Sequence, residues 1–389
     1  MRRIGLFISA NPRNGGLLQY TRSILAAFQS LPVDAFHKAI LCTDKWWENE
    51  LAGVSYAEFV TNGLLGRFFK LNLWLLIPEM QERLRSFCIR YCSLSKRIDA
   101  LDCDLWIFPA QDTWIYLNNS PSLAVVHDLM HRYEKSFREV GSPWEALARD
   151  RHYAQICRHA KAILVESSTG RKQLIDSYGP ETERIFVLPY APSLAIRQGP
   201  RVNRDLHDRL PPKFIFYPAQ FWEHKNHKSI VLAIARLKSP IPDVHAVFAG
   251  APKNGYDAVV KLISSLNLSD HFTFLGYVPD EDMPELYRRA RALIYPTFFG
   301  PTNLPPLEAF ASGCPVAVSD IYGMREQVGD AALLFDPRSV DEIAWAIRSV
   351  WTDGGLCKTL AERGMEKAGK WNQNHFSAAF ANILKTVLP

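Results

Sequence analysis

The sequence predicts an α/β protein built from two parallel-sheet domains. Short apolar runs alternate with segments of helical periodicity along most of the 389 residues, and this alternation is typical of βαβ units. The alternation is interrupted at Tyr190–Pro212, where five Pro or Gly residues stand among charged ones, as in a linker. A chain of this length also fits two domains of ordinary size. We therefore expect one domain on each side of the linker.

The first domain opens with a strand, a glycine turn and a helix. Ile4–Ala10 is a compact apolar run, as in strands that are buried on both faces. Gly15 and Gly16 lie in the following turn, and apolar residues then recur at helical spacing through Leu31. The glycines either let backbone N–H groups approach a ligand or serve the turn alone, because the dinucleotide-binding pattern GxGxxG is absent.

The remaining elements of this domain follow from apolar runs for strands and from periodicity and Ser/Thr caps for helices. We expect strands at Ala39–Thr43, Ser55–Val60, Asp104–Pro109, Leu123–His127, Ala162–Ser167 and Ile185–Leu188, and helices at Pro143–Ala160 and Ser168–Tyr178. His127 ends its strand, and the carboxyl ends of parallel strands border the ligand crevice of an open sheet. His131 follows four residues later, but a helical HExxH zinc site needs both histidines on one helix. We therefore do not expect zinc.

The stretch Leu64–Ala100 combines large apolar residues with seven Lys or Arg against three Asp or Glu. Its portion 64–97, with Phe68, Phe69 and Trp74, suits an anionic membrane surface as a basic amphipathic segment. The alternative is a helix that packs on the core and keeps a solvated basic face, since Pro78 interrupts the segment. The sequence leaves both interpretations open.

The second domain repeats the alternation. We expect strands at Lys213–Tyr217, Val244–Gly250, Phe272–Leu275 and Ala292–Pro296, and helices at Asn226–Leu237, Asp257–Leu266 and Glu281–Ala290. A last helix at Asn372–Leu388 follows a polar break. The expected domains are therefore residues 1–195 and 196–371, with the helix in 372–389 packing back onto the first.

The turn Phe298–Pro315 leads from a strand into a short helix, which we expect to start near Pro305 or Pro306 and to end at Gly313. The start of such a helix offers free N–H groups and a partial positive charge, so it suits a phosphate. Glu308 in the first turns would repel that phosphate. Either it binds another group, such as sugar hydroxyls, or it is an acid favoured there by the helix dipole alone.

Lys225 is a second candidate for phosphate binding, because it follows a predicted strand within the sequence HKNH. The alternative is an ordinary surface lysine. Two Rossmann-like domains facing across a cleft would bring Lys225 together with Gly15–Gly16, His127 and the Gly300–Glu308 turn, because each follows a strand.

Taken together, these motifs resemble the retaining glycosyltransferases of family 4, which have the two-domain GT-B fold. The resemblance covers nearly the whole chain. It is carried by the glycine pair before a helix, by His127–Asp128, and by the sequences PAQFWEHKN, LGYVPDEDMPELYRRARALIYPT, LPPLEAFASGCPVAVSD and GMREQVGDAALLFDP.

The resemblance implies a role for each matching residue. Lys225 would neutralise the donor diphosphate, Glu308 would bind ribose hydroxyls, and His127 would hydrogen-bond the transferred sugar. Further donor contacts are implied for the loop glycines and for N–H groups of the turn, at Gly15, Gly16, Thr302, Asn303 and Leu304. The resemblance implies no metal and no cofactor, because the leaving phosphate assists deprotonation of the acceptor hydroxyl.

Two positions depart from the family pattern. Gln220 stands where an Arg is usual, and Gly300 stands where the first acid of the E-x7-E pair is usual, with Glu308 as the second. The departures indicate either reduced activity or a variant sub-group with GPTNxPPLE and a different grip on the donor. Gln220 can still donate an N–H, and Thr302 or Asn303 can bond sugar hydroxyls.

The expected function is transfer of a hexose, with mannose from GDP-mannose as first candidate, to a hydroxyl of a growing, lipid-linked or free polysaccharide. The alternative is a non-catalytic GT-B subunit that binds a glycan or a partner enzyme, a role suggested by the two missing charged groups.

Composition bounds the partners and the compartment. The net charge of +5 is too mild to predict nucleic-acid binding. Seven scattered cysteines without a CxxC predict reduced thiols rather than a disulfide framework. The N-terminus lacks a signal-peptide cleavage site, and no apolar run reaches the roughly 18–20 residues of a membrane span. We expect a cytoplasmic protein, either free or peripheral on the inner face of the cytoplasmic membrane.

Overall fold

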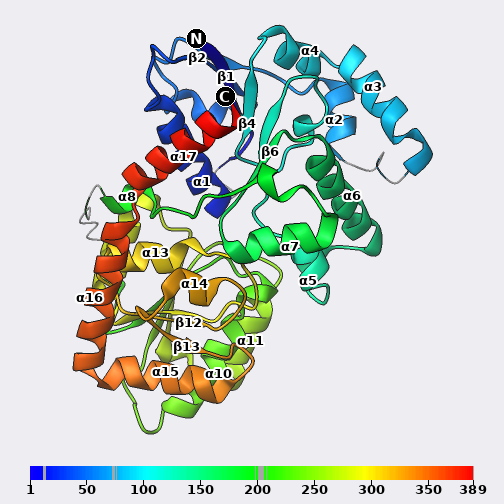
Figure 1. Cartoon of the computed structure of the whole chain (residues 1–389). Coiled ribbons are helices and arrows are strands. Elements are labelled where there is room, and N and C mark those ends of the chain that lie inside the picture. The colour runs from blue at the N-terminus through cyan, green and yellow to red at the C-terminus, as the bar shows by residue number, and fades with distance from the viewer. Residues whose placement is uncertain are drawn as a thin grey trace. The chain divides into compact units, whose positions relative to one another are not determined.

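A computed structural model describes residues 1–11, 15–71, 75, 77–197, 199, 206 and 208–388. The chain forms two compact units (Figure 1). Unit 1 comprises Met1–Lys135, Val140–Pro189 and Gln373–Pro389, and unit 2 comprises Ser136–Glu139 and Tyr190–Asn372. Each unit has its own parallel sheet and hydrophobic core. The prediction of two Rossmann-like parallel-sheet domains is therefore confirmed.

The sheet of unit 1 has seven described strands in the order β3-β2-β1-β4-β5-β6-β7. Their bounds are β1 Arg2–Ile8, β2 Phe36–Cys42, β3 Ala57–Phe59, β4 Leu105–Phe108, β5 Ser122–Val125, β6 Ala162–Val165 and β7 Ile185–Val187. The central strands β4, β5 and β6 are buried along their whole length. This burial explains why they appear in the sequence as continuous apolar runs rather than as alternating patterns.

The helices of unit 1 are α1 Gly16–Gln29, α2 Leu64–Lys70, α3 Gln81–Tyr91, α4 Ser93–Ala100, α5 Met130–Tyr133, α6 Pro143–His159, α7 Ser168–Tyr178 and α17 Gln373–Val387. Local sequence fixes several of their ends. Ser142 and Glu145 form a capping box around the start of α6, and Gly179 ends α7 in a left-handed conformation. The last helix packs on the first, α17 against α1 (Figure 1).

The sheet of unit 2 has six described strands in the order β10-β9-β8-β11-β12-β13. They are β8 Ile215–Pro218, β9 Ala246–Ala249, β10 Phe272–Gly276, β11 Ala292–Tyr295, β12 Val316–Ser319 and β13 Ala332–Phe335. The chain builds outward from β8 to β10 and then returns to place β11 on the other side of β8. This reversal is a topological switch point, and ligands of open α/β sheets bind at the carboxyl ends of the strands there.

The helices of unit 2 are α8 Leu194–Arg197, α10 His227–Leu237, α11 Tyr256–Ser265, α12 Met283–Arg289, α13 Leu304–Ala311, α14 Met324–Val328, α15 Val340–Thr352 and α16 Gly354–Lys370. Within its described residues, the expected linker contains the short helix α8. The described part of Leu64–Ala100 forms several short helices, because a 3-10 turn at Pro78–Met80 and an extended Cys92 interrupt it. Among the helices that the structure describes, none combines the length and the apolar character needed to cross a bilayer.

Candidate functional site

The two loops that the sequence singled out in the second domain both start at the switch point of unit 2. The loop with Gln220 and Lys225 follows β8, and the turn with Gly300 follows β11. Because β8 and β11 are hydrogen-bonded neighbours that run parallel, their carboxyl ends lie side by side. The sheet topology therefore brings Lys225 and the Gly300 turn to one edge.

A chain of hydrogen bonds connects these two loops through Tyr295, the last residue of β11. Lys225 Nζ donates to the Tyr295 hydroxyl at 3.2 Å, and that hydroxyl donates to Asn303 Oδ1 at 3.1 Å. The lysine ammonium also lies 5.5 Å from the centroid of the Tyr295 ring, within the range of a cation–π contact. Tyr295 thus fixes Lys225 relative to the start of α13.

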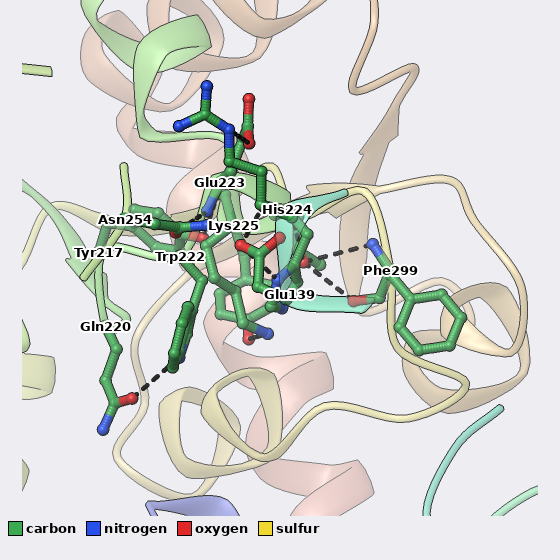
Figure 2. A network of polar contacts seen from close by, with 12 residues as sticks. Glu139, Tyr217, Gln220, Trp222, Glu223, His224, Lys225, Asn254 and Phe299 are labelled. Carbon is green, nitrogen blue, oxygen red and sulfur yellow. Dashed lines mark hydrogen bonds and ion pairs between the residues drawn. The ribbon is translucent and has the colours of Figure 1, made fainter. Parts of the chain in front are cut away.

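The loop after β8 is held by several partners (Figure 2). The Tyr217 hydroxyl donates to the Lys225 carbonyl, and the Glu223 N–H donates to Asn254 Oδ1 at 3.1 Å. Gln220 Oε1 accepts from the Trp222 indole at 3.0 Å. In Figure 2 the Gln220 amide nitrogen points away from Trp222, so this group is turned outward as a donor.

The backbone of Gly300 lies directly against the side chain of Asn303. Gly300 has a φ of 138°, and a Cβ built there would lie 2.6 Å from Asn303 Nδ2. Both the left-handed backbone and the lack of space exclude an L side chain in this conformation. With the Asn303 carboxamide in the adjacent space, position 300 therefore accepts only glycine in this conformation.

The other residues of the turn are also defined. The Asn303 N–H donates to Gln327 Oε1 at 2.9 Å, and Gln327 Nε2 donates to the Asn303 carbonyl, so this N–H already has a protein partner. Thr302 Oγ1 is buried and has no hydrogen-bond partner among the described residues. Leu304, the first residue of α13, is buried. An unpaired buried hydroxyl in a turn of this kind is available to a ligand.

Glu308 lies on α13 and is 8% exposed. Burial raises the pKa of Glu308, and hydrogen bonds from Ser193 and Tyr287 oppose this effect. The Tyr287 hydroxyl donates to Glu308 Oε2 at 2.8 Å. Each carboxylate oxygen can accept two hydrogen bonds, so these partners orient the carboxylate and still leave it capacity to accept from sugar hydroxyls.

His127 follows β5 in unit 1, and both ring nitrogens have partners there. Nδ1 lies 2.5 Å from Glu166 Oε1, and Nε2 lies 2.9 Å from the Pro109 carbonyl oxygen. The edge-on ring of Tyr20 packs at 5.0 Å between centroids. His127 could contact a sugar hydroxyl only by giving up or sharing one of these bonds.

The glycine turn of unit 1 starts α1. Gly15 is the N-cap residue with a φ of 53°, a conformation that favours glycine. Among the described residues, no atom lies within 4 Å of a Cβ built at Gly16. Tyr20, one turn later on α1, contacts His127. The structure thus brings the helix that follows the glycine pair against His127.

Sequence reasoning missed Tyr295, Gln327, Tyr287 and Glu166. Two of them carried a positional signal. Tyr295 ends β11, and Glu166 follows β6 as His127 follows β5, so both lie at carboxyl ends of strands, where ligand-site residues concentrate.

The chain is similar to known glycosyltransferases. Residues 203–367 match the family described as Glycosyl transferases group 1. The O-antigen chain mannosyltransferase B of Escherichia coli is 35% identical over 236 residues, which cover 58% of this chain and 61% of that protein. The O-antigen chain mannosyltransferase RfbU of Salmonella typhimurium is 27% identical over 199 residues, covering 50% and 51%. The chain thus spans between 51% and 61% of the length of these two relatives.

Solved structures share the fold over nearly the whole chain. Sucrose-phosphate synthase from Thermosynechococcus elongatus has a TM-score of 0.73 at 17% identity, covering 100% of this chain and 99% of that one. Anabaena HepE, solved with UDP and glucose, has a TM-score of 0.72 at 19% identity, covering 99% and 100%. Residues 203–367 are therefore similar to the glycosyl transferases group 1 family, and the chain has the GT-B fold.

Proposed function

We propose that this protein is a retaining glycosyltransferase of family 4. It transfers a hexose from a nucleotide-diphosphate sugar to a hydroxyl of a growing polysaccharide. Mannose is the first candidate for the sugar, because mannosyltransferases of O-antigen chains are among the relatives. GDP-mannose is the corresponding donor.

The observation that carries the proposal is the chain from Lys225 through Tyr295 to Asn303 at the switch point of unit 2. It presents one cation beside the start of α13, where the Leu304 N–H and the helix dipole favour an anion. A diphosphate fits this combination, since each charge-assisted hydrogen bond contributes roughly 1.5–3 kcal/mol. Glu308, further along the same helix, then binds the ribose hydroxyls.

The two departures from the family pattern fit a site that binds the donor through different groups, rather than an inactive site. The Gln220 amide supplies N–H groups in place of the usual Arg, and the Asn303 carboxamide fills the space beside Gly300. Thr302 Oγ1 supplies a further hydroxyl for the sugar. In this proposal the leaving phosphate deprotonates the acceptor, and no metal takes part, so EDTA leaves turnover unchanged. Loss of turnover that Mg²⁺ restores would contradict this part.

The test is transfer from GDP-mannose and a panel of other nucleotide sugars by Lys225→Ala and Glu308→Gln variants. Gln keeps an acceptor for the Tyr287 hydroxyl, so the fold survives the loss of charge. We expect each variant to lose at least about tenfold in turnover, since more than one decade corresponds to the 1.5–3 kcal/mol of a charged hydrogen bond. Lys261→Ala, an exposed lysine on α11, is the matched control. Equal turnover in all four proteins would overturn the site, and absence of nucleotide binding by the wild type would favour the non-catalytic subunit.

We also propose that α2 and α3 bind an anionic membrane surface on which a lipid-linked acceptor is held. Large apolar side chains in these helices and in the segment between them are exposed, at Leu64, Phe68, Leu71, Ile77, Phe87 and Tyr91, and Cys88 is the buried residue of α3. Of the aromatic residues named from the sequence, Phe69 is in the core and Trp74 lies outside the described residues. Exposed apolar residues interleaved with arginines suit the headgroup region of an anionic bilayer.

A further inference from the structure

Four residues that lie between parts of unit 1 in the sequence belong to unit 2. The chain leaves unit 1 after Lys135, contributes Ser136–Glu139 to unit 2, and re-enters unit 1 at Val140. We propose that Glu139, within this segment, is a positioning residue of the donor site that holds the Lys225 loop in its binding conformation. The inference deepens the proposed function and rests on it.

Glu139 contacts His224, the residue directly before Lys225 (Figure 2). Its Oε1 accepts from the His224 N–H at 3.3 Å, and His224 Nδ1 lies 3.4 Å from the same oxygen. The two side chains are 9% and 13% exposed. Because the pair is shielded from water, its polar contacts are stronger than those of a surface pair.

His224 in turn joins the two loops of the donor site. Its carbonyl oxygen accepts from the Phe298 N–H at 2.8 Å and from Thr297 Oγ1 at 3.3 Å. Phe137, two residues before Glu139, stacks on Phe298 with centroids 5.6 Å apart. The segment therefore contacts both the loop after β8 and the turn after β11, and its removal would release both.

The charge state of Glu139 suits this role. Burial alone would raise its pKa, but the adjacent His224 side chain and the backbone N–H groups outweigh burial and lower the pKa to about 2. Its second oxygen, Oε2, is buried without a hydrogen-bond partner among the described residues. A buried carboxylate with one oxygen that accepts no hydrogen bond costs free energy of folding. This cost favours a role for Glu139 in the donor site over a role in stability alone.

The test compares Glu139→Ala, which removes the acceptor, with Glu139→Gln, which keeps an oxygen for the His224 N–H. Glu183→Gln on the exposed surface of unit 1 is the matched control. We expect Glu139→Ala to weaken binding of GDP or UDP, measured by calorimetry, about tenfold, and Glu139→Gln to weaken it less. Hydrogen exchange of residues 220–226 in the ligand-free protein should accelerate in the same order, which a purely structural role elsewhere would not produce.

A double variant separates positioning from direct contact. If Glu139 acts through the Lys225 loop, Glu139→Ala adds little to Lys225→Ala, because interacting residues are not additive. Fully additive losses, or unchanged binding and exchange in Glu139→Ala while the wild type binds nucleotide, would overturn the positioning role alone. Absence of GDP and UDP binding by the wild type would overturn the proposed function, and this role with it.

Discussion

Glu166 Oε1 lies 2.5 Å from His127 Nδ1 inside unit 1, at the ends of two neighbouring strands. The other ring nitrogen faces the carbonyl oxygen of Pro109. A carbonyl can only accept, and an ionised carboxylate can only accept. The pair therefore holds one proton more than a neutral imidazole beside an ionised carboxylate.

This extra proton predicts a pH dependence. Burial lowers the pKa of His127, but the Glu166 carboxylate outweighs it, and the net pKa is raised. A raised histidine pKa contributes stability below about pH 6.5, and this contribution is lost as pH rises through the folded-state pKa. Glu166→Gln removes the anion, so burial then lowers the pKa of His127. We expect the alkaline fall of the melting temperature to be lost in this variant, because a histidine whose pKa is lowered on folding costs stability at low pH and not at high pH.

The measurement is the melting temperature between about pH 6 and 9, where histidine linkage acts. Glu183→Gln, on the surface, should follow the wild type. An alkaline limb at the same pH in Glu166→Gln and the wild type would mean that the carboxylate does not hold the proton on His127.

A second prediction concerns the hydroxyl between Lys225 and Asn303. Tyr295→Phe keeps the ring and the cation–π contact but removes both hydrogen bonds of the hydroxyl. The Asn303 carboxamide oxygen then loses its hydrogen-bond donor inside the site, which costs about 1–3 kcal/mol. We expect weaker binding of the donor nucleotide with a smaller change in the melting temperature. Calorimetry beside Tyr91→Phe on α3 tests this, and equal affinities would show that Lys225 needs no such support.

A third prediction follows from the conformation of Gly300. Gly300→Ala introduces a Cβ at a φ of 138° and 2.6 Å from Asn303 Nδ2, and such strain costs about 1–3 kcal/mol. By contrast, Gly369→Ala on α16 meets no atom within 4 Å and should be neutral or stabilising by up to about 1 kcal/mol. Denaturant unfolding of both variants measures the difference. Adding Asn303→Ala to Gly300→Ala should recover only part of the loss, because the backbone strain remains.

A fourth prediction tests the membrane surface. Vesicles that contain anionic lipid should sediment the protein at low salt and release it at high salt, since salt screens exposed charges. Arg83→Glu with Arg90→Glu, both exposed on α3, should abolish sedimentation. Trp345→Ser, which removes an exposed aromatic residue from unit 2, should leave it unchanged. Salt-independent or absent sedimentation of the wild type would contradict the proposal.

The sequence was most informative where local chemistry decides the structure. The apolar run Ala162–Ser167 is the buried strand β6, and the prolines near 305 do start a helix that ends before Gly313. Strands β12 and β13 and helices α14 to α16 were not predicted individually, although the family resemblance covered part of this stretch. The predicted bounds shift by a few residues elsewhere, as is usual for element ends.

The site was harder to predict because its partners are distant in sequence. Lys225 meets Tyr295 across 70 residues, and His224 meets Glu139 across 85. No local pattern links such pairs, since only the order of the strands brings them together. Residues at strand ends could be predicted as site residues from that position. Glu139 lies in a 3-10 turn, so its position did not predict a role in the site.

The placement of Ser136–Glu139 has a consequence for protein engineering. Unit 2 is discontinuous in sequence, because it draws four residues from far upstream of Tyr190. A recombinant fragment of residues 190–372 would retain Lys225 and Glu308 but lose the side chain that anchors His224. Chimaeras that exchange unit 2 between relatives must therefore include residues 136–139. Without them, we expect the loop that contains Lys225 to be less ordered.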